Sequence, residues 1–198
     1  MPLQWKKQWI SDETYESAGV WDVNGDGIPD IVSGAFWYEG PDFRKKHYIG
    51  EVPANGEYFD DFSTIALDIN GNGRLDFITG GWWGETLRWR ECPEDPTKPW
   101  PEHILAQTGN VETTRAWDID GDGVIEIIPN TPPNPEVAYY KLVTDASGKG
   151  TGTFKKVVVH TFDGKGQGHG LGCGDVAGNG RMDIVLCNGW LEAPGDPK

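Results

Sequence analysis

The stretch Asp22-Val-Asn-Gly-Asp-Gly-Ile-Pro-Asp30 is the first of four nine-residue segments that share one pattern. The other three are Asp68-Ile-Asn-Gly-Asn-Gly-Arg-Leu-Asp76, Asp118-Ile-Asp-Gly-Asp-Gly-Val-Ile-Glu126 and Asp175-Val-Ala-Gly-Asn-Gly-Arg-Met-Asp183. Their first residues are 46, 50 and 57 positions apart. This period is too long for helical-hairpin repeats and suits a unit of four short strands. The chain is therefore a tandem array built around four acidic loops, numbered one to four below.

Each repeat carries the same order of segments around its loop. Small and apolar residues enter the loops at 17–21, 63–67, 113–117 and 170–174, and short apolar runs leave them at 31–32, 77–78, 127–128 and 184–186. Segments with aromatic residues follow at 36–39, 87–91, 139–141 and 190–192, and candidate outer strands at 46–49, 102–105 and 157–160. Such runs beside Gly-rich turns predict buried strands, whereas the Pro- or Gly-rich segments 92–101, 129–135, 145–153 and 163–170 predict loops. We therefore expect an all-β fold, a β-propeller of four-stranded blades, in which residues 1–198 form a single domain.

The four loops contain the oxygen groups that calcium requires. Calcium takes six to eight oxygen ligands at about 2.3–2.6 Å, and one short loop can supply most of them. In loop one the predicted ligands, at positions 1, 3, 5, 7 and 9, are Asp22, Asn24, Asp26, Ile28 (through its carbonyl) and Asp30. The corresponding residues of the other loops are Asp68, Asn70, Asn72, Arg74 and Asp76; Asp118, Asp120, Asp122, Val124 and Glu126; and Asp175, Asn179, Arg181 and Asp183. The sequence thus predicts up to four bound Ca²⁺ ions.

Two other interpretations of the loops compete with this one. An EF-hand opens in the same way but has its last acid at position 12, between two helices, so it is excluded. A metal-free Asx turn, in which Asp and Asn side chains accept backbone amides, remains the alternative. If metal binds, the number of carboxylates ranks loops one and three above loops two and four. Ala177 removes the ligand at position 3 of loop four, which is the weakest predicted site.

The charge of the chain excludes some classes of partner. The formal net charge is −14, from 17 basic and 31 acidic residues. Such a chain repels nucleic acid and anionic membrane surfaces, and no apolar run approaches the ~20 residues that a membrane helix needs. Eleven of the acids belong to the four loops. Much of the acidity is therefore a predicted metal requirement.

The acidic loops at this spacing resemble the FG-GAP/VCBS repeat family, over nearly the whole chain. The resemblance implies a β-propeller with calcium between the first two strands of a blade. A narrower likeness is carried by Trp37-Tyr-Glu-Gly-Pro41, Trp190-Leu-Glu-Ala-Pro194, Gly168-His-Gly-Leu-Gly-Cys-Gly-Asp175 and Pro133-Asn-Pro-Glu-Val-Ala-Tyr-Tyr-Lys141. These segments are similar to the propeller of aldos-2-ulose dehydratase-type proteins, which implies zinc-assisted dehydration of keto-sugars. The likeness covers blade motifs and no catalytic motif, so it assigns no catalytic residue.

The number of blades leaves two arrangements open. Propellers of the family usually have seven blades, whereas this chain has four loops. In one arrangement the chain is the first half of a longer propeller, which further blades or a second copy complete. In the other it is a closed four-bladed ring, in which residues 5–10 (Trp-Lys-Lys-Gln-Trp-Ile) supply the outer strand of the fourth blade.

A second candidate site lies six residues before each loop. The residues at these positions are Glu16, Phe62, Glu112 and His169, with Asp60 and Asp61 next to Phe62. They begin the inner strands, at the end opposite the acidic loops, where the blades of a propeller converge. His169, Glu112 and Glu16 could hold one zinc ion that polarises a sugar carbonyl while a carboxylate or His169 removes the α-proton. The alternative is a solvated channel mouth, where polar residues are expected without a metal.

Two functions follow from these observations. The first is a non-catalytic module, extracellular or periplasmic, that binds carbohydrate or protein and uses calcium as a structural staple. The second is a metal-dependent keto-sugar dehydratase, a carbon–oxygen lyase. Aromatic faces could stack on sugar rings in either case, but most of Trp37, Tyr38, Trp82, Trp83, Trp89, Tyr139, Tyr140 and Trp190 are expected in the core.

Overall fold

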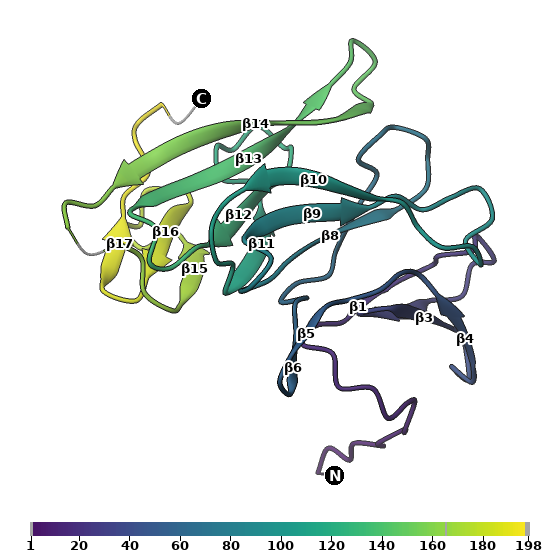
Figure 1. Ribbon diagram of the computed structural model, residues 1–198. Coiled ribbons are helices and arrows are strands. Elements are labelled where there is room, and N and C mark those ends of the chain that lie inside the picture. The colour runs from purple at the N-terminus through teal and green to yellow at the C-terminus, as the bar shows by residue number, and fades with distance from the viewer. Residues whose placement is uncertain (1, 165, 197–198) are drawn as a thin grey trace.

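The computed structural model describes residues 2–164 and 166–196, and these residues form 17 β-strands and no helix (Figure 1). The predicted all-β fold is therefore confirmed. In the described part of the chain there is accordingly no helix that could cross a membrane.

The strands form sheets that repeat one topology. The first sheet is β1 (Gly19–Trp21), β2 (Asp30–Ser33), β3 (Phe36–Glu39) and β4 (Lys45–Tyr48), and the second is β7 (Ile65–Leu67), β8 (Asp76–Gly80), β9 (Thr86–Arg90) and β10 (Glu102–Gln107). The third is β11 (Thr113–Trp117), β12 (Glu126–Asn130), β13 (Glu136–Thr144) and β14 (Gly150–Thr161), and the fourth is β15 (Leu171–Gly174), β16 (Asp183–Leu186) and β17 (Gly189–Leu191). A separate hairpin, β5 (Ala54–Asn55) and β6 (Tyr58–Phe59), follows the first sheet. Within each sheet every strand pairs antiparallel with the next one in sequence, so every repeat folds from local contacts.

Each acidic loop connects the first strand of its sheet to the second. The last residue of the first strand pairs with position 9 of the loop, as Trp21 does with Asp30 and Trp117 with Glu126. The entering, leaving, aromatic and outer segments predicted from sequence all overlap strands, with bounds that differ by one or two residues in most of them. The repeat pattern therefore located the strands correctly.

Neighbouring sheets pack face to face through apolar clusters. The clusters join the first sheet to the second (Trp21, Val32, Trp37, Phe77), the second to the third (Ile78, Leu87, Trp89, Ile127, Tyr140) and the third to the fourth (Ile128, Tyr139, Ile184, Leu186). Every residue of β8, β9 and β12 is buried, because these strands have a neighbouring sheet on both faces. Most of the aromatic residues are thus core residues, as expected, while Trp83 and Trp190 are 40% and 42% exposed.

Two predicted loops are partly strand. Residues 129–130 complete β12, where Pro129 pairs with Thr114 of β11. Residues 150–153 begin β14, which pairs with β13 from Glu136 to Thr144 in a long hairpin. The glycines of this segment predict a loop, but Gly150 belongs to the strand and pairs with Thr144. They accompany a shift of the register between Leu142 and Thr144 and do not end the strand.

The closed four-bladed ring is not what the structure contains. Within the described residues the fourth sheet has three strands, and residues 5–10 belong to no strand. The N-terminal segment instead lies against the first sheet, where Gln8 donates a hydrogen bond to the Asp42 carbonyl. In Figure 1 the four sheets follow one another in sequence order, with the first and the fourth at opposite ends of the molecule. The outer strand that residues 5–10 supply in the ring arrangement is therefore not placed at the fourth sheet.

Candidate functional site

The backbone of the four loops has one shape. The glycines at positions 4 and 6 have φ between 70° and 88° in every loop: Gly25, Gly27, Gly71, Gly73, Gly121, Gly123, Gly178 and Gly180. Most of them have open space where a Cβ would lie, so the positive φ rather than crowding requires glycine. The two left-handed residues turn the loop back on itself, and in loop one the side chains of positions 1, 3 and 5 accept backbone amides of the loop.

The acid at position 1 closes each loop by accepting backbone amides. Asp22 Oδ1 accepts Gly25 N at 2.8 Å and Asp26 N at 3.2 Å, while Oδ2 accepts Gly27 N at 2.8 Å. Asp68, Asp118 and Asp175 likewise accept the amides of positions 5 and 6 in the other loops. These are the bonds of the predicted Asx-turn alternative, in which no metal takes part. Carboxylate oxygens have further lone pairs, so the bonds are compatible with a metal as well.

The acid at position 9 has a second role that the sequence did not reveal. Asp30 is fully buried; its Oδ2 accepts Val23 N and its Oδ1 accepts Gly40 N, both at 2.8 Å. Asp76 and Asp183 also accept amides from their own loop and from a residue after the third strand. Burial raises the pKa of Asp76 to about 6. The acid at position 9 therefore links its loop, through hydrogen bonds, to the residues that follow the third strand of the same sheet.

Loop three departs from this pattern at Glu126. Its Oε2 accepts Ile119 N at 2.8 Å, but its Oε1 has no hydrogen-bond partner among the described residues. The Lys141 ammonium lies beside it, with Nζ 3.3 Å from Glu126 Oε1, 2.6 Å from Asp120 Oδ2 and 2.5 Å from Asp122 Oδ2. Burial lowers the pKa of Lys141, but these contacts outweigh it and raise the pKa above its ordinary value.

In loops one, two and four, no basic side chain of the described residues neutralises the loop acids as Lys141 does in loop three. In the described part of the chain, no basic side chain lies within ion-pair distance of Asp22, Asp26, Asp68 or Asp175. The guanidinium groups of Arg74 and Arg181 turn away from the loops, since each Nε donates to a carbonyl after the third strand. Only the backbone of these two arginines can serve as a ligand.

One group of acids meets a geometric criterion for metal binding. Asp118, Asp120 and Glu126 bring carboxylate oxygens within 4.8 Å of one another, and it is the one such group of three His, Cys, Asp or Glu side chains among the described residues. Loops two and four have Asn or Ala at positions where loop three has Asp, so they offer fewer carboxylates for such a group. The calcium ligands predicted for all four loops stay predictions.

At the opposite end of the first strands there is an open cavity of about 550 Å³. Residues 16–18, 62–65 and 112–116 line it, so three repeats contribute the starts of their first strands. Two of the three predicted channel residues, Glu16 and Glu112, are among them. The alignment of the repeats therefore identified Glu16 and Glu112 correctly as residues of one cavity.

His169 lies next to Glu112 rather than alone. Its Nδ1 is 3.0 Å from Glu112 Oε2, and its ring stacks on Trp82 at 5.5 Å between centroids and 8° between planes. Glu16 is held on the other side, where its Oε1 accepts Phe59 N and its own amide donates to Asp61. The structure thus pairs His169 with one carboxylate, whereas a catalytic zinc site normally has three protein ligands.

The two acids beside Phe62 are buried. Asp60 is 2% exposed, lies 3.2 Å from Arg88 Nη1 and accepts the amides of Trp83 and Gly84. Burial raises the pKa of Asp61 to about 7, and its Oδ2 has no hydrogen-bond partner among the described residues. Asp60 is therefore committed to an ion pair with Arg88 and to the turn that contains Trp83 and Gly84.

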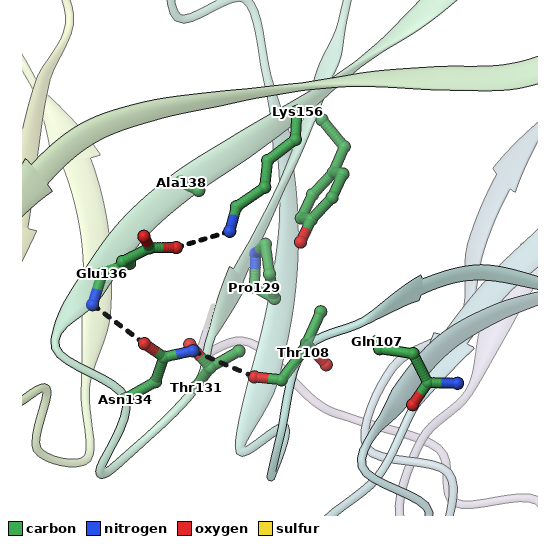
Figure 2. Close-up of a pocket in the computed structure, with 9 residues that line it drawn as sticks. Gln107, Thr108, Pro129, Thr131, Asn134, Glu136, Ala138 and Lys156 are labelled. Carbon is green, nitrogen blue, oxygen red and sulfur yellow. Dashed lines mark hydrogen bonds and ion pairs between the residues drawn. The ribbon is translucent and has the colours of Figure 1, made fainter.

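A smaller polar pocket lies where the second and third sheets meet (Figure 2). Asn134 crosses it: its Nδ2 donates to the Thr108 carbonyl at 3.1 Å and its Oδ1 accepts Glu136 N at 2.9 Å. Lys156 pairs with Glu136 at the rim. The space is about 20 Å³, enough for one water molecule and too small for a ligand.

Comparison with known proteins assigns the chain to no family. No family model matches it, and no curated protein matches it. Function is therefore inferred from the loops and the cavity themselves.

Proposed function

We propose that the chain is a calcium-binding β-propeller repeat module, in which the four sheets are consecutive blades and the acidic loops without a basic side chain at their carboxylates bind calcium. The cavity at residues 16–18, 62–65 and 112–116 would receive a carbohydrate or protein ligand, outside the cytoplasm. The propeller is supported by antiparallel sheets in sequence order that pack face to face. The first strands are in contact between the first and second sheets (β1 with β7) and between the third and fourth (β11 with β15).

The observation that carries calcium binding is the set of loops whose acids lack a cation. Loop one holds Asp22 and Asp26 near its surface, with Asp30 buried beneath them. Like charges within one nine-residue loop repel one another, and a divalent ion removes the repulsion. The donors are hard oxygens of carboxylates, amides and carbonyls, which are the ligands that calcium prefers.

Calcium is expected to raise the melting temperature relative to EDTA. A single site at a calcium concentration 100 times its Kd adds about 2.7 kcal/mol, which corresponds to roughly 5–10 °C for a chain of this size. Differential scanning calorimetry in EDTA, in millimolar calcium and in millimolar magnesium measures the shift and its selectivity. Equal melting temperatures in EDTA and calcium would mean that the loops are Asx turns and would refute the proposal.

A second function, keto-sugar dehydration, is favoured by the contact between His169 and Glu112. An imidazole in contact with Glu112, a carboxylate of the cavity wall, can accept a proton from a bound sugar, and Trp82 offers an aromatic face beside it. The described residues supply two zinc ligands there instead of three, so zinc binding stays a prediction. Release of water from 1,5-anhydrofructose or a 3-keto-sugar would identify this activity.

His169→Ala is expected to abolish zinc binding and to leave the calcium-induced rise in melting temperature intact. The imidazole is the one nitrogen ligand predicted for the channel, and it lies at the end of the strands opposite the loops. Isothermal titration with zinc measures this, with His160→Ala on the outer strand β14 as the matched control. Zinc binding that survives His169→Ala would remove the channel site.

A further inference from the structure

One position on the third strand faces the last acid of every loop. The ladder pairs Glu126 with Lys141 in the third sheet. In the other sheets the ladders end on the pairs Ile31 with Tyr38, Phe77 with Arg90 and Ile184 with Leu191. One step further along, Glu39, Glu91 and Glu192 stand opposite Asp30, Asp76 and Asp183. Three sheets thus have a glutamate at this position, and the third sheet has a lysine.

The two kinds of residue make different contacts with the loop. Glu91 Oε1 accepts Asn70 Nδ2 at 2.9 Å, and Glu192 Oε1 accepts Asn179 Nδ2 at 3.2 Å, so both glutamates reach side chains predicted as metal ligands. Lys141 instead places its ammonium on three acids of loop three. The loop with the most carboxylates is therefore the loop opposite the basic residue.

The length of β13 explains why the third sheet differs. In the other sheets the third strand ends near this position, and the next residue (Gly40, Cys92 or Ala193) donates its amide to the second oxygen of the buried Asp. β13 continues to Thr144 and pairs with β14, so no amide turns toward Glu126 Oε1. A cation is what can satisfy this buried oxygen, and the Lys141 ammonium lies 3.3 Å away.

We propose that Lys141 is the built-in cation of loop three, which occupies the place of a calcium ion and makes this loop independent of calcium. The carboxylates cluster as a metal site does, but a covalently attached ammonium fills the cluster at contact distance. The residue opposite the last acid then decides which loops bind calcium: glutamate adds a ligand, and lysine excludes the ion. This inference rests on the proposed function, because calcium can be excluded from one loop only if the other loops bind it. It also reverses the ranking by number of carboxylates, which placed loop three among the two strongest calcium sites.

Lys141→Met is expected to create one additional calcium site. The substitution removes the ammonium but keeps the unbranched side chain, so Asp118, Asp120, Asp122 and Glu126 become available to an ion. Calcium stoichiometry from isothermal titration should rise by one equivalent relative to wild type. Lys141→Arg, which keeps a cation, should keep the wild-type stoichiometry. Lys156→Met is the matched control, because its ammonium lies on the next strand and pairs with Glu136 away from the loop.

If Lys141→Met does not fold, a variant that adds a lysine beside loop one tests the same inference. Glu39→Lys places a lysine opposite Asp30 on the partly exposed rim of loop one, and it should remove one equivalent of calcium. An unchanged stoichiometry in every Lys141 and Glu39 variant that folds would overturn the inference.

The outcomes separate this inference from the proposed function. Calcium binding by wild type tests the proposed function, and the difference between Lys141→Met and wild type tests the role of Lys141. If wild type binds no calcium but Lys141→Met binds one equivalent, the proposed function fails and the role of Lys141 stands. If wild type binds at loop three with Lys141 present, as terbium luminescence lost in Asp122→Ala would show, the inference fails and the proposed function stands.

Discussion

Replacing Asp30 by Ala is expected to lower the free energy of unfolding by about 3–5 kcal/mol, even in EDTA. The carboxylate is fully buried and accepts two amides at 2.8 Å, from Val23 and Gly40. A hydrogen bond to a charged group contributes about 1.5–3 kcal/mol, and each buried amide left without an acceptor adds its own cost. Urea denaturation monitored by Trp fluorescence measures the change.

The matched control is Asp26→Ala in the same loop, where the carboxylate is exposed. In EDTA this variant should lose no more than about 1 kcal/mol, as is usual for surface sites. In calcium it should lose the contribution of loop one, because position 5 is a predicted ligand. If Asp30→Ala were no less stable than Asp26→Ala in EDTA, the buried acid would not anchor the fold.

Replacing Arg88 by Met is expected to destabilise the second sheet by about 3–5 kcal/mol, because it leaves a buried carboxylate without its partner. Arg88 is 4% exposed, and its guanidinium contacts Asp60 and lies 3.4 Å from Glu102. Asp60 holds the turn after β8 through the amides of Trp83 and Gly84, so the loss should spread to this turn. Urea denaturation again gives the magnitude.

A double-mutant cycle identifies the cause of this loss. Arg88→Met combined with Asp60→Asn should be less damaging than the sum of the two single changes, because the uncompensated charge is gone. Lys45→Met, which removes an exposed ion pair with Glu39, should cost less than about 1 kcal/mol. Additive effects of Arg88→Met and Asp60→Asn would show that the pair contributes through packing alone.

The positions of the strands could be predicted because each repeat folds from neighbouring segments. Gly25 and Gly27 mark the tight loop, and the apolar runs on either side of it become β1 and β2. Local sequence patterns could not show whether the four sheets close into a ring. Residues 5–10 have the composition of an outer strand, but contacts with the first sheet decide where they lie.

The sequence by itself determined the all-β class, the number of repeats and the acids of the loops, since glycine spacing and apolar runs act within a few residues. Only the tertiary structure decided what each acid does. Asp30 and Asp76 are buried hydrogen-bond acceptors, and Glu126 faces Lys141 across the ladder from β12 to β13. These roles depend on which strand continues and which one turns, and that is set by pairing between residues ten or more positions apart. A nine-residue pattern contains no information on that pairing.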